Sequence, residues 1–165
     1  MVQVIKDPLG SKGARLSAHI SIAGRTLVLL PHGNAIGVSQ KIDVLQREAL
    51  RTHVVELVEQ FATTHGGGNN GASQPTCGYI VRTNAEGASD VEMLRDMQYL
   101  NTTWQAIKAT SQREAAPALL HRDLNLMQRV LRDMVNDNTL KIGRARVCKF
   151  AQKPAWSGTA HSSQR

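Results

Sequence analysis

Aromatic residues, cysteines and long apolar runs are all scarce in this 165-residue sequence. No segment approaches the roughly 18 to 20 apolar residues of a transmembrane helix. The N-terminus lacks a basic region followed by an apolar one, so no secretory signal is expected. Aromatic residues make up 4% of the chain and hydrophobic residues 41%, so we expect a core of mainly Leu, Val, Ile and Ala. That core suits one ordinary domain, or parts of two.

The two cysteines and six histidines do not have the spacing of a metal site. Cys77 and Cys148 lie far apart, which favours free thiols in a reducing compartment, and we therefore expect a cytoplasmic protein. The histidines show neither HxxxH nor HExxH spacing, and no carboxylate pair stands out as a metal-binding dyad. We predict no catalytic residue and no metal ligand in this chain.

Most acidic side chains fall on amphipathic helix faces beside basic residues, where we expect them to be solvated. Examples are Glu48, Glu56, Glu59, Glu92 and Asp96. The net charge of +7 is concentrated at the C-terminus, since residues 143–165 hold five basic residues and no acidic one, whereas residues 1–142 hold 15 basic and 13 acidic residues. Phosphate binding within residues 1–142 would therefore depend on local placement of charge. The tail at 143–165 has no hydrophobic period, and we expect it to be disordered.

Hydrophobic periodicity predicts an α+β fold, with a small antiparallel sheet and packed helices. Alternation from Arg15 to Ile22, a turn at 23–25 and the apolar run 26–30 are typical of a β-hairpin. Three- and four-residue spacing predicts the helices. The further elements expected are a loop at 32–37, a helix over 39–63, a strand at 78–81, a helix from 90 to about 110, an extended segment at 115–123 and a helix that Asp123 caps and that ends at Val135.

Two of these helices have a predicted inward face. Ser89 and Glu92 form a capping-box pattern that opens the helix after the 78–81 strand. The inward residues expected on that helix are Val91, Leu94, Leu100, Trp104 and Ile107. Those expected on the last helix are Leu124, Met127, Val130, Leu131 and Met134.

The glycine-rich segment 65–76 mimics two catalytic motifs without their context. Gly66–Gly71 satisfies GxGxxG, but it leaves a helix and precedes a strand, the reverse of a dinucleotide site. His65–Gly68 resembles a lipase oxyanion loop, yet the chain has no GxSxG nucleophile elbow. We interpret the segment as a flexible linker.

Arg82 and Thr83 stand directly after the apolar 78–81 strand and invite two interpretations. A guanidinium can bind two phosphate oxygens at once, and a neighbouring hydroxyl with backbone amides can complete a pocket for one terminal phosphate. Alternatively, Arg82 forms a structural salt bridge with Glu86 or Asp90 at the helix start. Spacing alone favours the salt bridge.

Four segments resemble consecutive blocks of the ribonuclease E/G family, and within it the ribonuclease G branch. They read VQVIKDPLGSKGARLSAHISIAGRTLVLLP, GYIVRTNAEGAS, DMQYLNTTWQAI and APALLHRDLNLMQRVLRDMV. The resemblance covers residues 2–142 in uninterrupted order, apart from the glycine linker. Members of this family are bacterial endoribonucleases in which an RNA-binding OB-fold precedes a 5′-sensor subdomain, an RNase H-like part and a DNase I-like catalytic part.

The resemblance implies a division of the chain along that architecture. Residues 1–14 would be the exit segment of an OB-fold, 15–114 the 5′ sensor, 115–142 the start of the RNase H-like part and 143–165 a basic disordered tail. In the family the sensor recognises the 5′-monophosphate of RNA through an Arg-Thr pair, which matches Arg82 and Thr83.

Further contacts with RNA are implied by the same resemblance. Gly24 matches a glycine that lies against the first nucleotide, and the backbone at Val28 is expected to contribute. Lys6 and Lys12 fall where the family follows the RNA backbone. Lys41 stands in a segment where relatives often carry paired arginines, so it keeps only a point charge there.

The catalytic parts of the family are not matched by this sequence. The aspartates that hold magnesium and the cysteine motif that binds zinc belong to those parts, so both metals are implied only for the complete family enzyme. We therefore expect a fragment that binds single-stranded RNA with a 5′-monophosphate and does not cleave it alone. The alternatives are an inactive truncated remnant, or an interaction fragment that associates with an intact homologue. No membrane partner is expected.

Overall fold

The computed structural model describes residues 1–65, 77–135 and 138–143. The predicted linker at 65–76 and the predicted disordered tail at 143–165 lie outside the described residues, except for the first residue of each. Met1–Val135 forms one compact unit and Asn136–Arg165 a second. In the second unit, residues 138–143 are described and form no helix or strand. No helix in the described ranges is long and apolar enough to cross a membrane.

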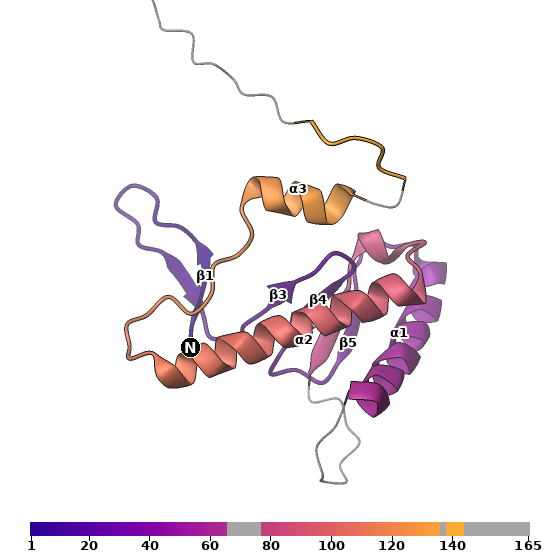
Figure 1. The fold of residues 1–165 in the computed structure, drawn as a ribbon, viewed down its shortest axis with the longest axis horizontal. Helices are drawn as coiled ribbons and strands as arrows, with labels where there is room; N and C mark the ends of the chain where they lie inside the picture. Colours follow the sequence, from indigo (N-terminus) through magenta and orange to yellow (C-terminus); the bar gives the residue numbers. More distant parts are fainter. Residues whose placement is uncertain (66–76, 136–137, 144–165) are drawn as a thin grey trace, which may run out of the picture. The chain divides into compact units, whose positions relative to one another are not determined.

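The strands of the first unit form two sheets (Figure 1). The strands are β1 (Gln3–Lys6), β2 (Arg15–Ser17), β3 (Ile22–Ala23), β4 (Leu27–Leu30), β5 (Ile36–Val38) and β6 (Gly78–Val81). β1 and β2 form an antiparallel pair, and the other four form a sheet in the order β3-β4-β6-β5. Its pairings are antiparallel except for β5 with β6. The fold is α+β, which confirms the predicted class.

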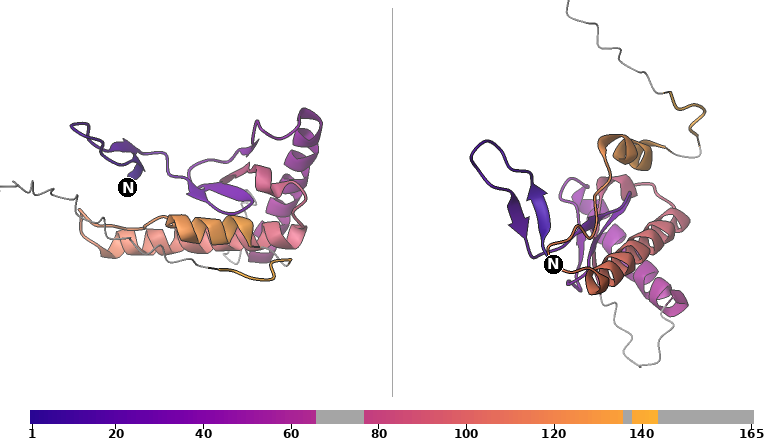
Figure 2. Two further views of the ribbon diagram at one scale, coloured as in Figure 1. Left: turned by 90° about the horizontal axis from the view of Figure 1, so that it is seen from above. Right: turned by 60° about the vertical axis from the view of Figure 1, so that its left-hand side comes forward.

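Two long helices cover one face of the four-stranded sheet (Figures 1 and 2). α1 (Val44–His65) packs on β5 and β6, and α2 (Asp90–Arg113) packs on β3 and β4. Leu27 and Leu29 of β4 are fully buried, while the alternating Val28 and Leu30 are half-buried. Strand side chains alternate between faces, so one face of β4 belongs to the core beneath the helices.

The start of α2 follows from its sequence. The Ser89 side chain accepts a hydrogen bond from the Glu92 N–H, and the Glu92 carboxylate accepts one from the Ser89 N–H at 3.0 Å. These bonds satisfy backbone donors that the helix itself cannot, and they confirm the predicted capping box. On the inward face, Leu100, Trp104 and Ile107 are buried as predicted. Val91 is 56% exposed, so its predicted burial is wrong.

The segment between β4 and α1 differs from the prediction. The expected loop at 32–37 contains the start of β5, and the expected helix over 39–63 begins only at Val44. Asp43 fixes this start because its carboxylate accepts a hydrogen bond from the Leu45 N–H at 2.8 Å. β5 pairs in parallel with a strand about 40 residues later, so no local turn signal marks it.

The N-terminal hairpin also differs from the prediction, since the alternation from Arg15 to Ile22 is divided between two sheets. β2 pairs with β1, whereas β3 pairs with β4. The Gln3 side chain links the two sheets by hydrogen bonds to the backbone of Ser21, at 2.8 Å to its N–H and 3.0 Å to its carbonyl. The boundary that we expect after residue 14, between an OB-fold exit segment and a 5′ sensor, coincides with the start of β2. The assignment of the two parts stays a prediction.

The last helix, α3 (Leu126–Met134), presents its apolar side chains to solvent. Asn125 caps it with Gln128 as the reciprocal partner, so the expected cap at Asp123 is wrong by two residues. The predicted inward face is also wrong. Four of its members are more than 40% exposed: Met127, Val130, Leu131 and Met134. The side of α3 that contacts the rest of the unit is the one that carries Arg132 and Asp133.

Candidate functional site

The β3–β4 turn is held by a buried carboxylate from α2. The Asp96 side chain, in a residue that is 9% exposed, accepts hydrogen bonds from the backbone N–H groups of Arg25 (3.0 Å), Thr26 (2.8 Å) and Leu27 (2.9 Å). It also accepts one from the Thr26 hydroxyl at 3.0 Å. The expectation that Asp96 lies on a solvated face is therefore wrong: it is a structural partner of the turn.

Gly24 lies against this carboxylate. A Cβ placed on Gly24 would lie 2.7 Å from the Asp96 Cγ and closer still to its oxygens. Only glycine therefore fits the turn unless Asp96 shifts. The requirement for glycine here has a cause within the protein itself, besides the contact with a first nucleotide that the family resemblance implies.

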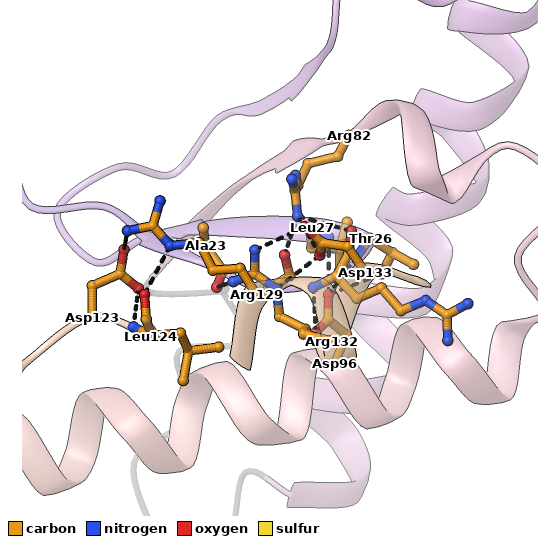
Figure 3. Close-up of polar contacts among 12 residues, drawn as sticks. Ala23, Thr26, Leu27, Arg82, Asp96, Asp123, Leu124, Arg129, Arg132 and Asp133 are labelled. Carbon is orange, nitrogen blue, oxygen red and sulfur yellow. Dashed lines mark hydrogen bonds and ion pairs between the residues drawn. The ribbon is translucent and has the colours of Figure 1, made fainter. Parts of the chain in front are cut away.

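Arg82 leaves the carboxyl end of β6 and turns its guanidinium onto the same turn (Figure 3). Its backbone N–H donates to the Thr26 carbonyl at 2.8 Å. Its Nη1 donates to the carbonyls of Gly24 and of Arg25, the latter at 3.1 Å. The side chain remains 29% exposed.

The ion-pair partner of Arg82 is Asp133 of α3, with 3.4 Å between Nη1 and Oδ1. The alternative that Arg82 pairs with Glu86 or Asp90 is wrong, and Asp90 instead contacts His53 at 2.9 Å. Within the described ranges, the contacts of the Arg82 guanidinium all go through Nη1.

Arg132 fixes Asp133 in this position. Its Nε and Nη2 donate to the two Asp133 carboxylate oxygens at 2.8 and 3.2 Å, and its Nη1 donates to the Ala23 carbonyl at 2.8 Å. This paired hydrogen bond from Arg132 lowers the pKa of Asp133 below its usual range, and the charge of Arg82 lowers it further. The same hydrogen bond raises the pKa of Arg132. A carboxylate that remains ionised therefore faces Arg82.

Of the other predicted contacts, Thr83 and Lys41 follow two strands, β6 and β5, that end at the same edge of the sheet. Thr83 follows Arg82 and begins the 3-10 turn Thr83–Ala85 with its side chain exposed. The Ser39 N–H donates to the Val81 carbonyl at 2.9 Å, so the segment with the exposed Lys41 leaves from the same end of the sheet.

The other residues predicted to contact RNA are Val28, Lys6 and Lys12. Val28 stands opposite Ala23 on one side and Ile80 on the other, so its backbone lies between two paired strands. Lys6 ends β1, and Lys12 forms a backbone bridge with Leu9. Both lysines are exposed in the region of the two-stranded sheet.

Three side chains that complete this site, Asp96, Arg132 and Asp133, were not predicted to belong to it, because their partners lie far along the chain. Asp96 stands 69 to 71 residues from its partners in the turn, and Asp133 stands 51 residues from Arg82. A single clue exists in retrospect, because Asp96 falls among apolar residues on the buried face of α2, between Met93 and Leu100.

The site contains no set of residues suited to magnesium or zinc. No group of three or more His, Cys, Asp and Glu side chains in the described part of the chain is arranged to hold a metal ion. The Asp96 oxygens already accept hydrogen bonds from the turn, and those of Asp133 are bound by Arg132. We therefore derive no metal-dependent step for these residues.

The described unit is a small α+β domain that presents a guanidinium at the carboxyl end of a strand, an arrangement suited to binding an oxyanion. The chain belongs to the ribonuclease E/G family, which it matches over residues 21–153. It is 35% identical to ribonuclease E from Nostoc sp. over 165 residues, covering 96% of this chain and 22% of that relative. It is 37% identical to ribonuclease G from Escherichia coli over 136 residues, covering 82% of this chain and 25% of that relative.

Ribonuclease G from Haemophilus influenzae gives a similar result, with 35% identity over 142 residues, 86% of this chain and 26% of that relative. The chain thus spans about a quarter of the length of these curated relatives. The family match ends at residue 153. Similarity therefore extends further toward the C-terminus than the residues 2–142 expected from the sequence alone.

Proposed function

We propose that this chain binds the 5′-monophosphate end of single-stranded RNA at Arg82, as the 5′ sensor of a protein involved in RNA processing and decay. The observation that carries the proposal is the state of the guanidinium: it is anchored through Nη1, partly exposed, and placed at the end of a strand. Arginine has five N–H donors in a planar fork. The donors of Nε and Nη2 can therefore meet two phosphate oxygens while Nη1 keeps its carbonyl partners.

The phosphate must obtain its donors from side chains rather than from the turn. The N–H groups of Arg25, Thr26 and Leu27 already donate to Asp96. The exposed hydroxyl of Thr83 and the ammonium of Lys41 are the further donors proposed for this end of the sheet. A charge-assisted hydrogen bond contributes about 1.5 to 3 kcal/mol, so binding through Arg82 favours a terminal phosphate over a hydroxyl by roughly tenfold or more.

Fluorescence anisotropy with one short RNA that carries either a 5′-monophosphate or a 5′-hydroxyl tests the proposal. The basic C-terminal residues attract both RNAs alike through counterion release, so the ratio of the two dissociation constants is the informative quantity. We expect the wild type to prefer the monophosphate and Arg82→Ala to abolish that preference. Arg82→Lys should retain little of it, because lysine keeps the charge but loses the fork.

Arg51→Ala is the matched control. Arg51 is exposed on α1, so its removal lowers the positive charge equally and should reduce binding of both RNAs without changing their ratio. Equal binding of the two RNAs by the wild type, at the same salt concentration, would refute the proposal.

The exposed face of α3 favours a second candidate function, association with an intact protein of the same family. Leu131 and Met134, for example, are 43% and 71% exposed on a helix whose polar side faces the unit. Exposed apolar patches of this kind are typical of interaction surfaces. Retention of the chain on an immobilised full-length ribonuclease G, lost on Leu131→Glu, would support association. No retention of the wild type would refute association, and only together with equal binding of the two RNAs would it leave an inactive remnant as the remaining alternative.

A further inference from the structure

We infer that Asp96 is a positioning residue for the Arg82 site, an inference that rests on the proposed function. Asp96 does not touch Arg82, and no contact with RNA is assigned to it. It acts through the three peptide groups of the β3–β4 turn, each of which is hydrogen-bonded to the Asp96 carboxylate on one side and to Arg82 on the other.

The three peptide groups share one arrangement. The group between Gly24 and Arg25 donates its N–H to Asp96 at 3.0 Å and offers its carbonyl to Arg82 Nη1. The next group donates the Thr26 N–H to Asp96 at 2.8 Å and offers the Arg25 carbonyl to Nη1 at 3.1 Å. The third donates the Leu27 N–H to Asp96 at 2.9 Å and offers the Thr26 carbonyl to the Arg82 N–H at 2.8 Å.

The planarity of the peptide bond explains why this arrangement positions Arg82. In a trans peptide the N–H and the C=O point in opposite directions and cannot rotate separately. When Asp96 binds three successive N–H groups, it directs the three carbonyls away from itself and toward Arg82. Its negative charge also polarises each peptide group, which strengthens the bond that the carbonyl accepts.

The consequence for RNA binding is a guanidinium whose orientation is set before the phosphate arrives. A free arginine side chain loses rotamer entropy when it binds a ligand. Here two carbonyls already hold Nη1, so the orientation of Nε and Nη2 follows from the plane of the guanidinium. Gly24 is part of the same arrangement, because a Cβ at that position would push the Asp96 carboxylate away from the turn.

Asp96→Asn tests this inference with the same pair of RNAs. One carboxamide atom becomes a donor and must face an N–H donor of the turn. We expect the monophosphate preference to fall at least about threefold, the effect of losing one ordinary hydrogen bond. Affinity for the 5′-hydroxyl RNA should not fall, because the substitution removes a negative charge.

Thr26→Val is the matched control, because it removes the hydroxyl donor to the same carboxylate and leaves the three peptide N–H groups in place. We expect it to lower the melting temperature and to keep the monophosphate preference. If the role of Asp96 is only structural, both variants will lower the melting temperature and both will keep the preference.

The hydrogens on Arg82 Nη1, which donate to the Gly24 and Arg25 carbonyls, give a direct readout by NMR without RNA, assigned by their loss in Arg82→Lys. We expect slow hydrogen exchange at Nη1 in the wild type and in Thr26→Val, and fast exchange in Asp96→Asn. Should Asp96→Asn fail to fold, Gly24→Ala takes its place with the same expected change in exchange.

The outcomes separate the inference from the proposed function. A wild type with no monophosphate preference overturns both. A wild-type preference that persists in Asp96→Asn, with slow exchange at Arg82, overturns the role of Asp96 and leaves the sensor function standing. Slow exchange in Gly24→Ala overturns it equally.

Discussion

Replacing Asp133 by Asn should strengthen the binding of 5′-monophosphorylated RNA. Asp133 places an ionised carboxylate 3.4 Å from Arg82 Nη1, and a phosphate on the same guanidinium must displace this carboxylate or remain beside it. Asparagine keeps an oxygen that can accept the hydrogen bond from Arg132. The substitution therefore removes the competing charge with little change in the shape of α3.

The magnitude follows from the exposure of the pair. The side chains of Arg82 and Asp133 are 29% and 27% exposed, and an ion pair near the surface contributes about 0.2 to 1 kcal/mol. Removing it should raise the affinity for the monophosphorylated RNA by about 1.4- to 5-fold. We expect the upper part of this range, because Asp133 also repels a phosphate that carries close to two negative charges.

Asp123→Asn provides the control for this measurement. Asp123 lies in the same segment and pairs with Arg129 at 3.4 Å rather than with Arg82. Both substitutions change the net charge of the chain by the same amount, so a general electrostatic effect would raise binding equally in both. Anisotropy with the two RNAs should show a higher preference for the monophosphate in Asp133→Asn alone. Equal effects of the two variants, or weaker binding by Asp133→Asn, would refute competition at Arg82.

Two predictions concern the stability of the strand and the helix that position the site, β6 and α2. Burial raises the pKa of Tyr79 to about 12, although the hydrogen bond from Asn101 opposes the shift. Because the pKa is higher in the folded state, the neutral Tyr79 side chain contributes stability below about pH 10, and this contribution is lost between about pH 10 and about pH 12. Urea unfolding should therefore show a fall in the free energy of unfolding over this pH range. The fall should be smaller in Tyr79→Phe. Ser89→Ala removes the N-cap of α2 and should lower the free energy of unfolding by about 1 kcal/mol, seen as a lower urea midpoint at constant slope; an unchanged midpoint would mean that the capping box contributes nothing.

The elements that could be predicted are those whose signal is local. The capping box at Ser89 and Glu92 lies within four residues, and the apolar runs of β4 and β6 are visible in the sequence itself. The helix period located α2 correctly, and three of the five residues expected to face the core on this helix are buried. Val91 was misplaced because the buried side of the first turn of α2 carries Met93, which is 2% exposed, and Val91 lies on the other side of the helix.

The elements that could not be predicted depend on partners far along the chain. β5 has three residues and pairs in parallel with β6, so neither a hairpin turn nor a long apolar run marks it. α3 has a clear apolar stripe, and periodicity alone assigns such a stripe to the core. The stripe is exposed because Arg132 and Asp133, on the other side of the helix, contact the Ala23 carbonyl and Arg82.

The position of Arg82 shows why the two interpretations of its sequence context are not exclusive. As a structural residue, it holds the β3–β4 turn and α3 through a single nitrogen, Nη1. A lysine would use its only nitrogen for the same partners and have no second donor group in a fixed plane. An arginine anchored in this way has a preset orientation, and its remaining donors are available to a ligand. The structural role is thus a condition for the proposed phosphate binding, in which a phosphate would take the place of Asp133 beside Arg82.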